Sequence, residues 1–279
     1  WCVSWRELNT CLVHDMVAFQ GKLIVAGQFS SIGHPLIHAN NIASLNGSVW
    51  APLSNGLNNM VKDIEVHNGI LYAGGDFTMA GNTSANKIAS WNGSSWSALP
   101  QGGINGVANN VEALLSSAWG LVVGGKFNAV GSSALTANNI ARWNPVSGWA
   151  TFGSGLNGPV FALSHFNGNI VAGGHFGNSP GGLNNLAIWV GYWTKVGGGG
   201  AVTLSTPPII STEGIYAITQ YKNDLIVGGQ FPSAVSTTVL NGTKTQHLAQ
   251  WNGAYWTTIG IGPNPPGSSI NTGNGVFAL

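Results

Sequence analysis

The sequence repeats itself about every 48 residues, and this rhythm limits the folds that the chain can adopt. A glycine-rich motif that ends in phenylalanine recurs at Phe29, Phe77, Phe127, Phe176 and Phe231, with spacings of 48, 50, 49 and 55 residues. A motif of the form Ile-Ala-x-Trp follows each Phe, with small variations, and another Trp comes a few residues later. A period of about 40 to 50 residues indicates an array of structurally equivalent units.

Each repeat predicts four short antiparallel strands. An apolar stretch such as Val160–Leu163 is followed by a turn such as Asn167-Gly168 and by a strand that ends in a glycine pair. Asn-Gly favours a tight hairpin because both residues tolerate a positive φ. The glycine pair predicts that another backbone approaches closely there or that the strand bends. The third strand carries Ile-Ala-x-Trp, and the fourth carries the later Trp.

Four-stranded units at this period predict an all-β fold, a β-propeller of about six blades. We expect a single domain over residues 1–279, with repeats at 11–58, 59–108, 109–157, 158–212 and 213–270. The two ends resemble complementary pieces of one repeat, so residues 1–10 and 271–279 are expected to share a sixth blade. A piece of a longer repeat array is the alternative. The recurrent Phe and Trp side chains are expected to form the core between blades.

The full pattern, Gly-Gly-x-Phe followed by Asn-x-Ile-Ala-x-Trp-Asn-Gly-x-x-Trp, resembles kelch-like repeats of the secreted or cell-surface type. Such repeats occur in bacterial surface proteins and in the ectodomains of fungal cortical markers. Ile140–Pro145 followed by Trp149 is the stretch with the closest likeness. The resemblance covers nearly the whole chain and implies a propeller, an extracellular setting and interaction roles. It implies no catalytic residues.

Charge is scarce, at 6% of residues, with nine Lys and Arg against eight Asp and Glu. Typical soluble domains carry about 25%. No cluster of cations could neutralise phosphates, so we expect no nucleic acid partner. The sequence contains no apolar run of about 18 residues, the length that would predict a membrane span. A surface rich in Asn, Ser, Thr and Gly fits a secreted or cell-surface protein that assembles or carries glycans.

Two short motifs match enzyme signatures but lack the context that the chemistry needs. Residues 153–158 match G-x-G-x-x-G, yet strands are expected on both sides, whereas a dinucleotide site needs a helix after the motif. Residues 177–181 match G-x-S-x-G, but Pro180 follows the Ser and has no N–H to serve as an oxyanion donor. We therefore expect no cofactor.

The candidate acids and metal ligands are few. His34 and His38 share one loop without a carboxylate or Cys close in sequence, so no metal site is expected. Asp15 and Asp63 hold equivalent repeat positions, which favours a structural role. Asp63 and Glu65 lie on one strand face and could approach as a glycosidase pair does, but nothing else supports catalysis.

Cys2 and Cys11 are expected at opposite ends of one strand, which favours two free thiols or partners outside this segment over a bridge between them. A Cys2–Cys11 disulfide is the alternative. Glycosylation sequons occur at Asn46, Asn82, Asn92 and Asn241, all in expected turns or loops. Trp119 lies at a turn where other repeats carry Asn or Gly, so its indole is the best candidate contact for a glycan or another partner.

These features favour a secreted, non-enzymatic structural or interaction module, such as a scaffold or adhesive component of an extracellular assembly. Its partners would be proteins or further copies of the chain on an extracellular surface. A glycan-binding, lectin-like propeller is the alternative. A carbohydrate-active enzyme is the third reading, and it would need acids from different blades to converge.

Overall fold

The structure is a computed structural model that describes residues 12–100, 104–105, 110–131, 135–176, 185–196, 214–229, 248–254, 256–257, 259 and 279. Every regular element in these residues is a β-strand. The described residues hold no helix that could cross a bilayer. The chain divides into two compact units, residues 1–155 and 156–279.

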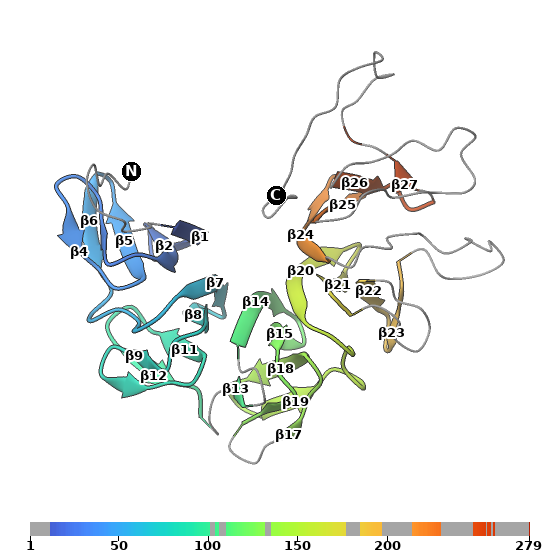
Figure 1. Ribbon diagram of the computed structural model, residues 1–279, viewed down its shortest axis with the longest axis horizontal. Coiled ribbons are helices and arrows are strands. Elements are labelled where there is room, and N and C mark those ends of the chain that lie inside the picture. The colour runs from blue at the N-terminus through green and yellow to red at the C-terminus, as the bar shows by residue number, and fades with distance from the viewer. Residues whose placement is uncertain are drawn as a thin grey trace. The chain divides into compact units, whose positions relative to one another are not determined.

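The first unit contains three four-stranded antiparallel sheets, coloured blue to green in Figure 1. Their strands are β1 (Leu12–Phe19), β2 (Lys22–Gln28), β5 (Ile42–Asn46) and β6 (Val49–Pro52); β7 (Val61–His67), β8 (Ile70–Gly75), β11 (Ile88–Trp91) and β12 (Trp96–Ala98); and β14 (Asn110–Ser117), β15 (Gly120–Lys126), β18 (Ile140–Asn144) and β19 (Gly148–Thr151). Short strands lie in or beside the connections: β3 (Ser31–Ile32), β4 (Ile37–His38), β9 (Met79–Ala80), β10 (Thr83–Ser84), β13 (Ile104–Asn105), β16 (Ala129–Val130) and β17 (Leu135–Thr136).

The second unit contains two sheets of the same kind. Their strands are β20 (Val160–Phe166), β21 (Asn169–Gly174), β22 (Leu186–Trp189) and β23 (Trp193–Lys195), and β24 (Ile215–Tyr221), β25 (Asp224–Gly229), β26 (Leu248–Trp251) and β27 (Trp256–Thr257). In all five sheets each long strand pairs with the next in chain order.

The fold class is that of a β-propeller, as the repeat predicts. Within each unit the first strand of one sheet contacts the first strand of the next, β1 with β7, β7 with β14, and β20 with β24. The described residues form five such blades, so the prediction of about six is slightly too high. Residues 1–10 and 271–278, expected to share a sixth blade, lie outside the described residues. The expectation of a single domain stays a prediction.

The two residues of the glycine pair have different structural roles. A Cβ on the second glycine would clash with the carbonyl oxygen of the residue just before the blade's own first strand, Met60 for Gly75 and Pro159 for Gly174. A Cβ on the first glycine would meet the next blade, as Gly173 shows with Ile215 Cγ2 at 2.6 Å. The first glycine therefore lets blades approach each other, and the second makes room for an irregularity in the first strand.

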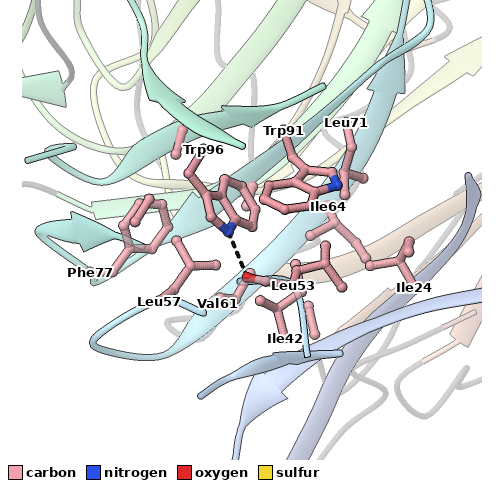
Figure 2. Close-up of a cluster of buried hydrophobic side chains, with 14 of the residues drawn as sticks. Ile24, Ile42, Leu53, Leu57, Val61, Ile64, Leu71, Phe77, Trp91 and Trp96 are labelled. Carbon is pink, nitrogen blue, oxygen red and sulfur yellow. Dashed lines mark hydrogen bonds between the residues drawn. The ribbon is translucent and has the colours of Figure 1, made fainter. Parts of the chain in front are cut away.

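Aromatic side chains fill the space between neighbouring blades, as expected. Trp91 and Trp96, partners across β11 and β12, lie 5.1 Å apart between ring centroids. Figure 2 shows them against Ile24 and Ile42 of the preceding blade. Among the described residues, the Phe of this motif is buried at Phe29, Phe77, Phe127 and Phe176, with exposed fractions from 0% at Phe77 to 6% at Phe29. The repeat pattern is thus the pattern of this core.

A left-handed residue precedes the third strand of each of the first four blades. Asn41, Lys87, Asn139 and Asn185 have φ of 63°, 69°, 63° and 68°. Asn41 shows why Asn suits the position. Its Oδ1 accepts a hydrogen bond from the backbone N–H of Phe29 at 3.1 Å, and its Nδ2 donates to the Leu57 carbonyl at 2.7 Å. Asn both tolerates a positive φ and ties a blade to the chain that leaves it.

Blade 1 differs from the blades after it in the exposure of its first strand. Val13 is 45% exposed and Met16 is 57% exposed. Their equivalents in blade 2, Val61 and Ile64, are 0% and 2% exposed. Among the described residues, these two positions are therefore packed in blade 2 and exposed in blade 1.

One hydrogen bond in this core gives a testable result. The Trp96 indole N–H donates to the buried Leu53 carbonyl at 3.0 Å, the dashed line in Figure 2. Trp96→Phe removes this bond, while the Leu53 carbonyl still accepts a hydrogen bond from the Gly56 N–H at 3.0 Å, so we expect the free energy of unfolding to fall by about 1 kcal/mol. Urea unfolding followed by circular dichroism measures this. Trp50→Phe is the control, since no hydrogen bond joins the Trp50 indole to another described residue, and an equal loss there would contradict the role of the bond.

Candidate functional site

The first strand of every blade carries a β-bulge at the same place. Pairing with the second strand shifts between Val13 and Asp15, Val61 and Asp63, Val111 and Ala113, Val160 and Ala162, and Ile215 and Ala217. The extra residues are His14, Lys62, Glu112, Phe161 and Tyr216, which we name the bulge residues. Bulges are common beside functional sites because they redirect a side chain.

Bulge residues of successive blades contact each other within each unit. In the first unit, Lys62 Nζ lies 2.7 Å from Glu112 Oε1, across β7 and β14. In the second unit, the rings of Phe161 and Tyr216 stack with centroids 5.1 Å apart and an interplanar angle of 25°. The bulges therefore line up side chains in two rows, a polar one in the first unit and an aromatic one in the second.

The polar row is supported by groups from the ends of the second strands and the starts of the first. Asp76, just after β8, lies 3.5 Å from Lys62 Nζ. Asn110 Nδ2 donates to Glu112 Oε1 at 2.6 Å. One cation thus faces two carboxylates, and their side chains are 18% to 31% exposed, so solvent can still reach them.

Burial and neighbouring charges shift the pKa of Glu112 and of His14 in the polar row. Burial raises the pKa of Glu112, while the hydrogen bond and charge of Lys62 lower it. Burial lowers the pKa of His14, and the nearby Lys62 cation lowers it further. His14 is therefore neutral at pH 7 and can accept or donate a hydrogen bond.

Directly after the bulges, two aspartates tie the blades together. Asp15 Oδ2 accepts a hydrogen bond from the Ile64 N–H at 2.9 Å, and Asp63 Oδ2 accepts one from the Leu114 N–H at 2.6 Å. Burial raises the pKa of Asp63 well above its ordinary range, and the charge of Asp15 and a hydrogen bond to it raise it further. Beyond the effect of burial, the pKa of Asp63 rises because two like charges so close together repel each other. These contacts agree with the structural role expected for this repeat position.

Glu65, the other candidate acid, also serves the neighbouring backbone. Its carboxyl accepts a hydrogen bond from the Ser116 N–H, and burial raises its pKa to about 7. Two residues on, His67 is 4% exposed and its Nδ1 lies 2.9 Å from Ser116 Oγ. Asn68 Nδ2 lies 3.2 Å from His67 Nε2. Because an amide nitrogen donates and does not accept, Nε2 is the acceptor and the ring proton lies on Nδ1. In that tautomer His67 cannot take a proton from Ser116.

The structure places the other sequence candidates as follows. His34 and His38 are exposed on the β3–β4 hairpin, and no three His, Cys, Asp or Glu in the described residues are placed to hold a metal. Residues 153–158 lie between β19 and β20 with no helix, so the dinucleotide reading stays excluded there. Residues 177–181 and both cysteines lie outside the described residues.

The described sequons and Trp119 lie at exposed positions at or near turns. Asn46, Asn82 and Asn92 are exposed, and Asn241 lies outside the described residues. Trp119 is 56% exposed in the turn between β14 and β15, with the Arg142 guanidinium carbon 6.0 Å from its ring centroid. The expectation of an exposed indole is confirmed, whereas its contact with a partner stays a prediction.

The bulge residues escaped the sequence reasoning, although a signal was present. Aligned on the first strand, the repeats read apolar, variable, then Asp or Ala: Val13-His14-Asp15, Val61-Lys62-Asp63, Val111-Glu112-Ala113, Val160-Phe161-Ala162 and Ile215-Tyr216-Ala217. The first position is Val or Ile in every blade, and the third is Asp or Ala. The middle position changes chemistry from blade to blade and holds a large side chain each time.

Fold and site together define a β-propeller of repeated blades that presents variable side chains from equivalent bulges. No protein-family model matches the chain, and no curated protein matches it. The kelch-like character of the repeat therefore stays an interpretation of the sequence.

Two solved structures are similar to it. The extracellular domain of a putative one-component system from B. thetaiotaomicron aligns with 12% identity and a TM-score of 0.56, over 99% of this chain and 31% of that one. A computationally designed protein, Ika8, aligns with 13% identity and a TM-score of 0.48, over 86% of this chain and 58% of that one. The chain spans less than two thirds of either structure, and the likeness concerns the fold alone.

Proposed function

We propose that this protein is an extracellular, non-enzymatic interaction module that recognises its partner through the bulge residues. The observation that carries the proposal is the contrast within the first strands. The position before the bulge is Val or Ile in all five blades and the position after it is Asp or Ala, whereas the bulge itself carries His, Lys, Glu, Phe or Tyr. Packing does not require such variety, but recognition does.

Composition and fold support the extracellular setting. Only 6% of residues are charged, a level that suits a secreted scaffold or adhesive protein better than a crowded cell interior. The fold resembles that of the extracellular domain of a putative one-component system. The carboxyls most suited to acid–base chemistry, Asp63 and Glu65, are engaged with the backbone of β14, which supports a non-enzymatic role.

The test compares binding by the wild type with that by Lys62→Gln/Glu112→Gln. This double variant removes both charges of the ion pair but keeps polar side chains of similar size, so the melting temperature should stay within about 3 °C. We expect the wild type to bind intact cells or extracellular matrix of its source, and the variant to bind at least 10-fold more weakly. The readout is the binding of fluorescently labelled protein.

Lys22→Gln/Asp224→Asn is the matched control, since it also removes one cation and one carboxylate, away from the bulges. Equal binding by the bulge variant and the wild type would refute recognition through these residues. Turnover of a polysaccharide that Asp63→Asn abolishes would refute the non-enzymatic part.

Glycan binding is a second candidate function. The stacked Phe161 and Tyr216 and the exposed Trp119 are the kinds of surface on which a sugar ring packs. A glycan array without any hit would remove this candidate and leave protein partners or self-assembly.

A further inference from the structure

The turn between β14 and β15 differs from the equivalent turns in a way that admits a large side chain. In blades 1, 2 and 4 the second turn residue is Gly21, Gly69 or Gly168, with φ of 74°, 75° and 78°. In blade 3 the positive φ, 112°, falls one residue later on Gly120, whose place beside the Trp143 carbonyl leaves no room for a Cβ. Trp119 therefore needs no left-handed backbone.

The turn is also held in place by its own side chain. Ser117 Oγ accepts a hydrogen bond from the Trp119 N–H at 3.1 Å and donates one to the Gly120 carbonyl at 2.7 Å. An indole presented by a fixed turn loses little conformational entropy when a ligand binds.

Blade 3 departs from the other blades at a second position, which touches the first. The third strand of each blade ends its motif with Trp, except in blade 1, where Leu45 takes that place. The residue before it is uncharged in the other four blades: Ser44, Ser90, Ile188 and Gln250. In blade 3 it is Arg142, and its guanidinium carbon lies 6.0 Å from the Trp119 ring centroid. The two departures occur in the same blade and form one cation–π pair.

The Arg142 guanidinium has no protein acceptor within the described residues. The ion pairs found there are those of Lys62, and no hydrogen bond joins the Arg142 side chain to another described residue. Its five N–H groups form a planar fork that matches a carboxylate. In a chain with 6% charged residues, an arginine that has no acceptor among the described residues and lies beside an exposed tryptophan is not explained by packing.

We propose that Trp119 and Arg142 form a binding site for a carboxylate-bearing sugar, such as a uronic acid residue of a polysaccharide. The C–H face of the sugar ring stacks on the indole, and its carboxylate accepts two hydrogen bonds from the guanidinium. An acidic peptide would use the arginine but would leave the flat indole without a matching surface. This inference rests on the recognition role proposed above, but the site lies at the opposite end of β14 from the bulge residue Glu112.

Calorimetric titration with oligomers of galacturonic acid tests the site. Galactose oligomers test the need for the carboxylate, sulfated galactose oligomers distinguish carboxylate from sulfate, and oligo-glutamate represents an acidic peptide. We expect galacturonate to bind at least 10-fold more tightly than the other three. Trp119→Ala and Arg142→Gln should each weaken binding at least 10-fold. Arg142→Lys should restore only part of it, since lysine keeps the charge and loses the fork.

Tyr221→Ala is the matched control, because Tyr221 is 62% exposed and also has a cation, Lys222 Nζ, 5.3 Å from its ring centroid. It should bind galacturonate as the wild type does. Equal binding of galactose, a preference for sulfate or oligo-glutamate, or wild-type binding by Arg142→Gln would overturn this inference. The Lys62→Gln/Glu112→Gln variant should still bind galacturonate, so failure here and failure of the bulge proposal can be told apart.

Discussion

Gly75→Ala is expected to lower the free energy of unfolding of the first unit by about 3 kcal/mol or more. The added Cβ would coincide with the Met60 carbonyl oxygen, a backbone atom fixed by the bulge in β7. A backbone atom cannot move aside as the end of a flexible side chain can, so the bulge or the pairing of β7 with β8 must be lost. Thermal and urea unfolding, with circular dichroism as the signal, measure the change.

Gly69→Ala provides the control for that substitution. Gly69 lies in the turn of the same hairpin with φ of 75°, and a Cβ there would have nothing within 4 Å. The left-handed backbone alone should cost about 1 kcal/mol. Equal losses for the two variants would mean that the second glycine of the pair serves chain flexibility rather than the bulge.

The second large effect is a gain of stability in acid. Burial raises the pKa of Glu65 from 4.5 to about 7, so the folded chain binds more protons than the unfolded chain between these values. The free energy of unfolding should therefore fall as the pH rises from about 4.5 to about 7. The full shift corresponds to about 3 kcal/mol, but Glu65 keeps some contact with water, so we expect about 2 kcal/mol. The raised pKa of Asp63 adds to the change with the same sign.

Urea titrations at pH 5 and pH 8 test this prediction. Glu65→Gln resembles the protonated acid, so it should be more stable than the wild type at pH 8 and should lose the share of the pH dependence that Glu65 contributes, while the share from Asp63 remains. Asp224→Asn, in the second unit, should leave the dependence for the first unit unchanged. A wild type that is more stable at pH 8 than at pH 5 would contradict the buried, protonated state of Glu65.

The sequence predicted the blades well because each residue of the repeat motif has a local structural role. The glycine pair, the Asn-Gly turns and the paired Trp residues each act within one repeat or between neighbours. The count of six blades was less secure, because it depended on residues 1–10 and 271–279 rather than on a complete repeat.

The candidate site was harder to predict. A bulge arises from pairing between two strands, so the special place of Lys62 or Phe161 cannot be read from local propensity. The pairing of Asp15 with Asp63 likewise depends on the contact of β1 with β7. Trp119 was found because other repeats carry Asn or Gly at this turn. Arg142 was not found, because nothing in the sequence spacing links it to Trp119.

The central claim is that the bulge residues are free to vary while their neighbours pack. The most direct test is a display library that randomises Lys62, Glu112, Phe161 and Tyr216 together, next to one that randomises Val61, Val111, Val160 and Ile215, with protease resistance as the measure of folding. We predict that a large share of the first library folds with many residue types at each site, and that the second folds only with Val, Ile or Leu. Equal restriction of both libraries would contradict the claim, because it would show that the bulge residues are needed for the fold.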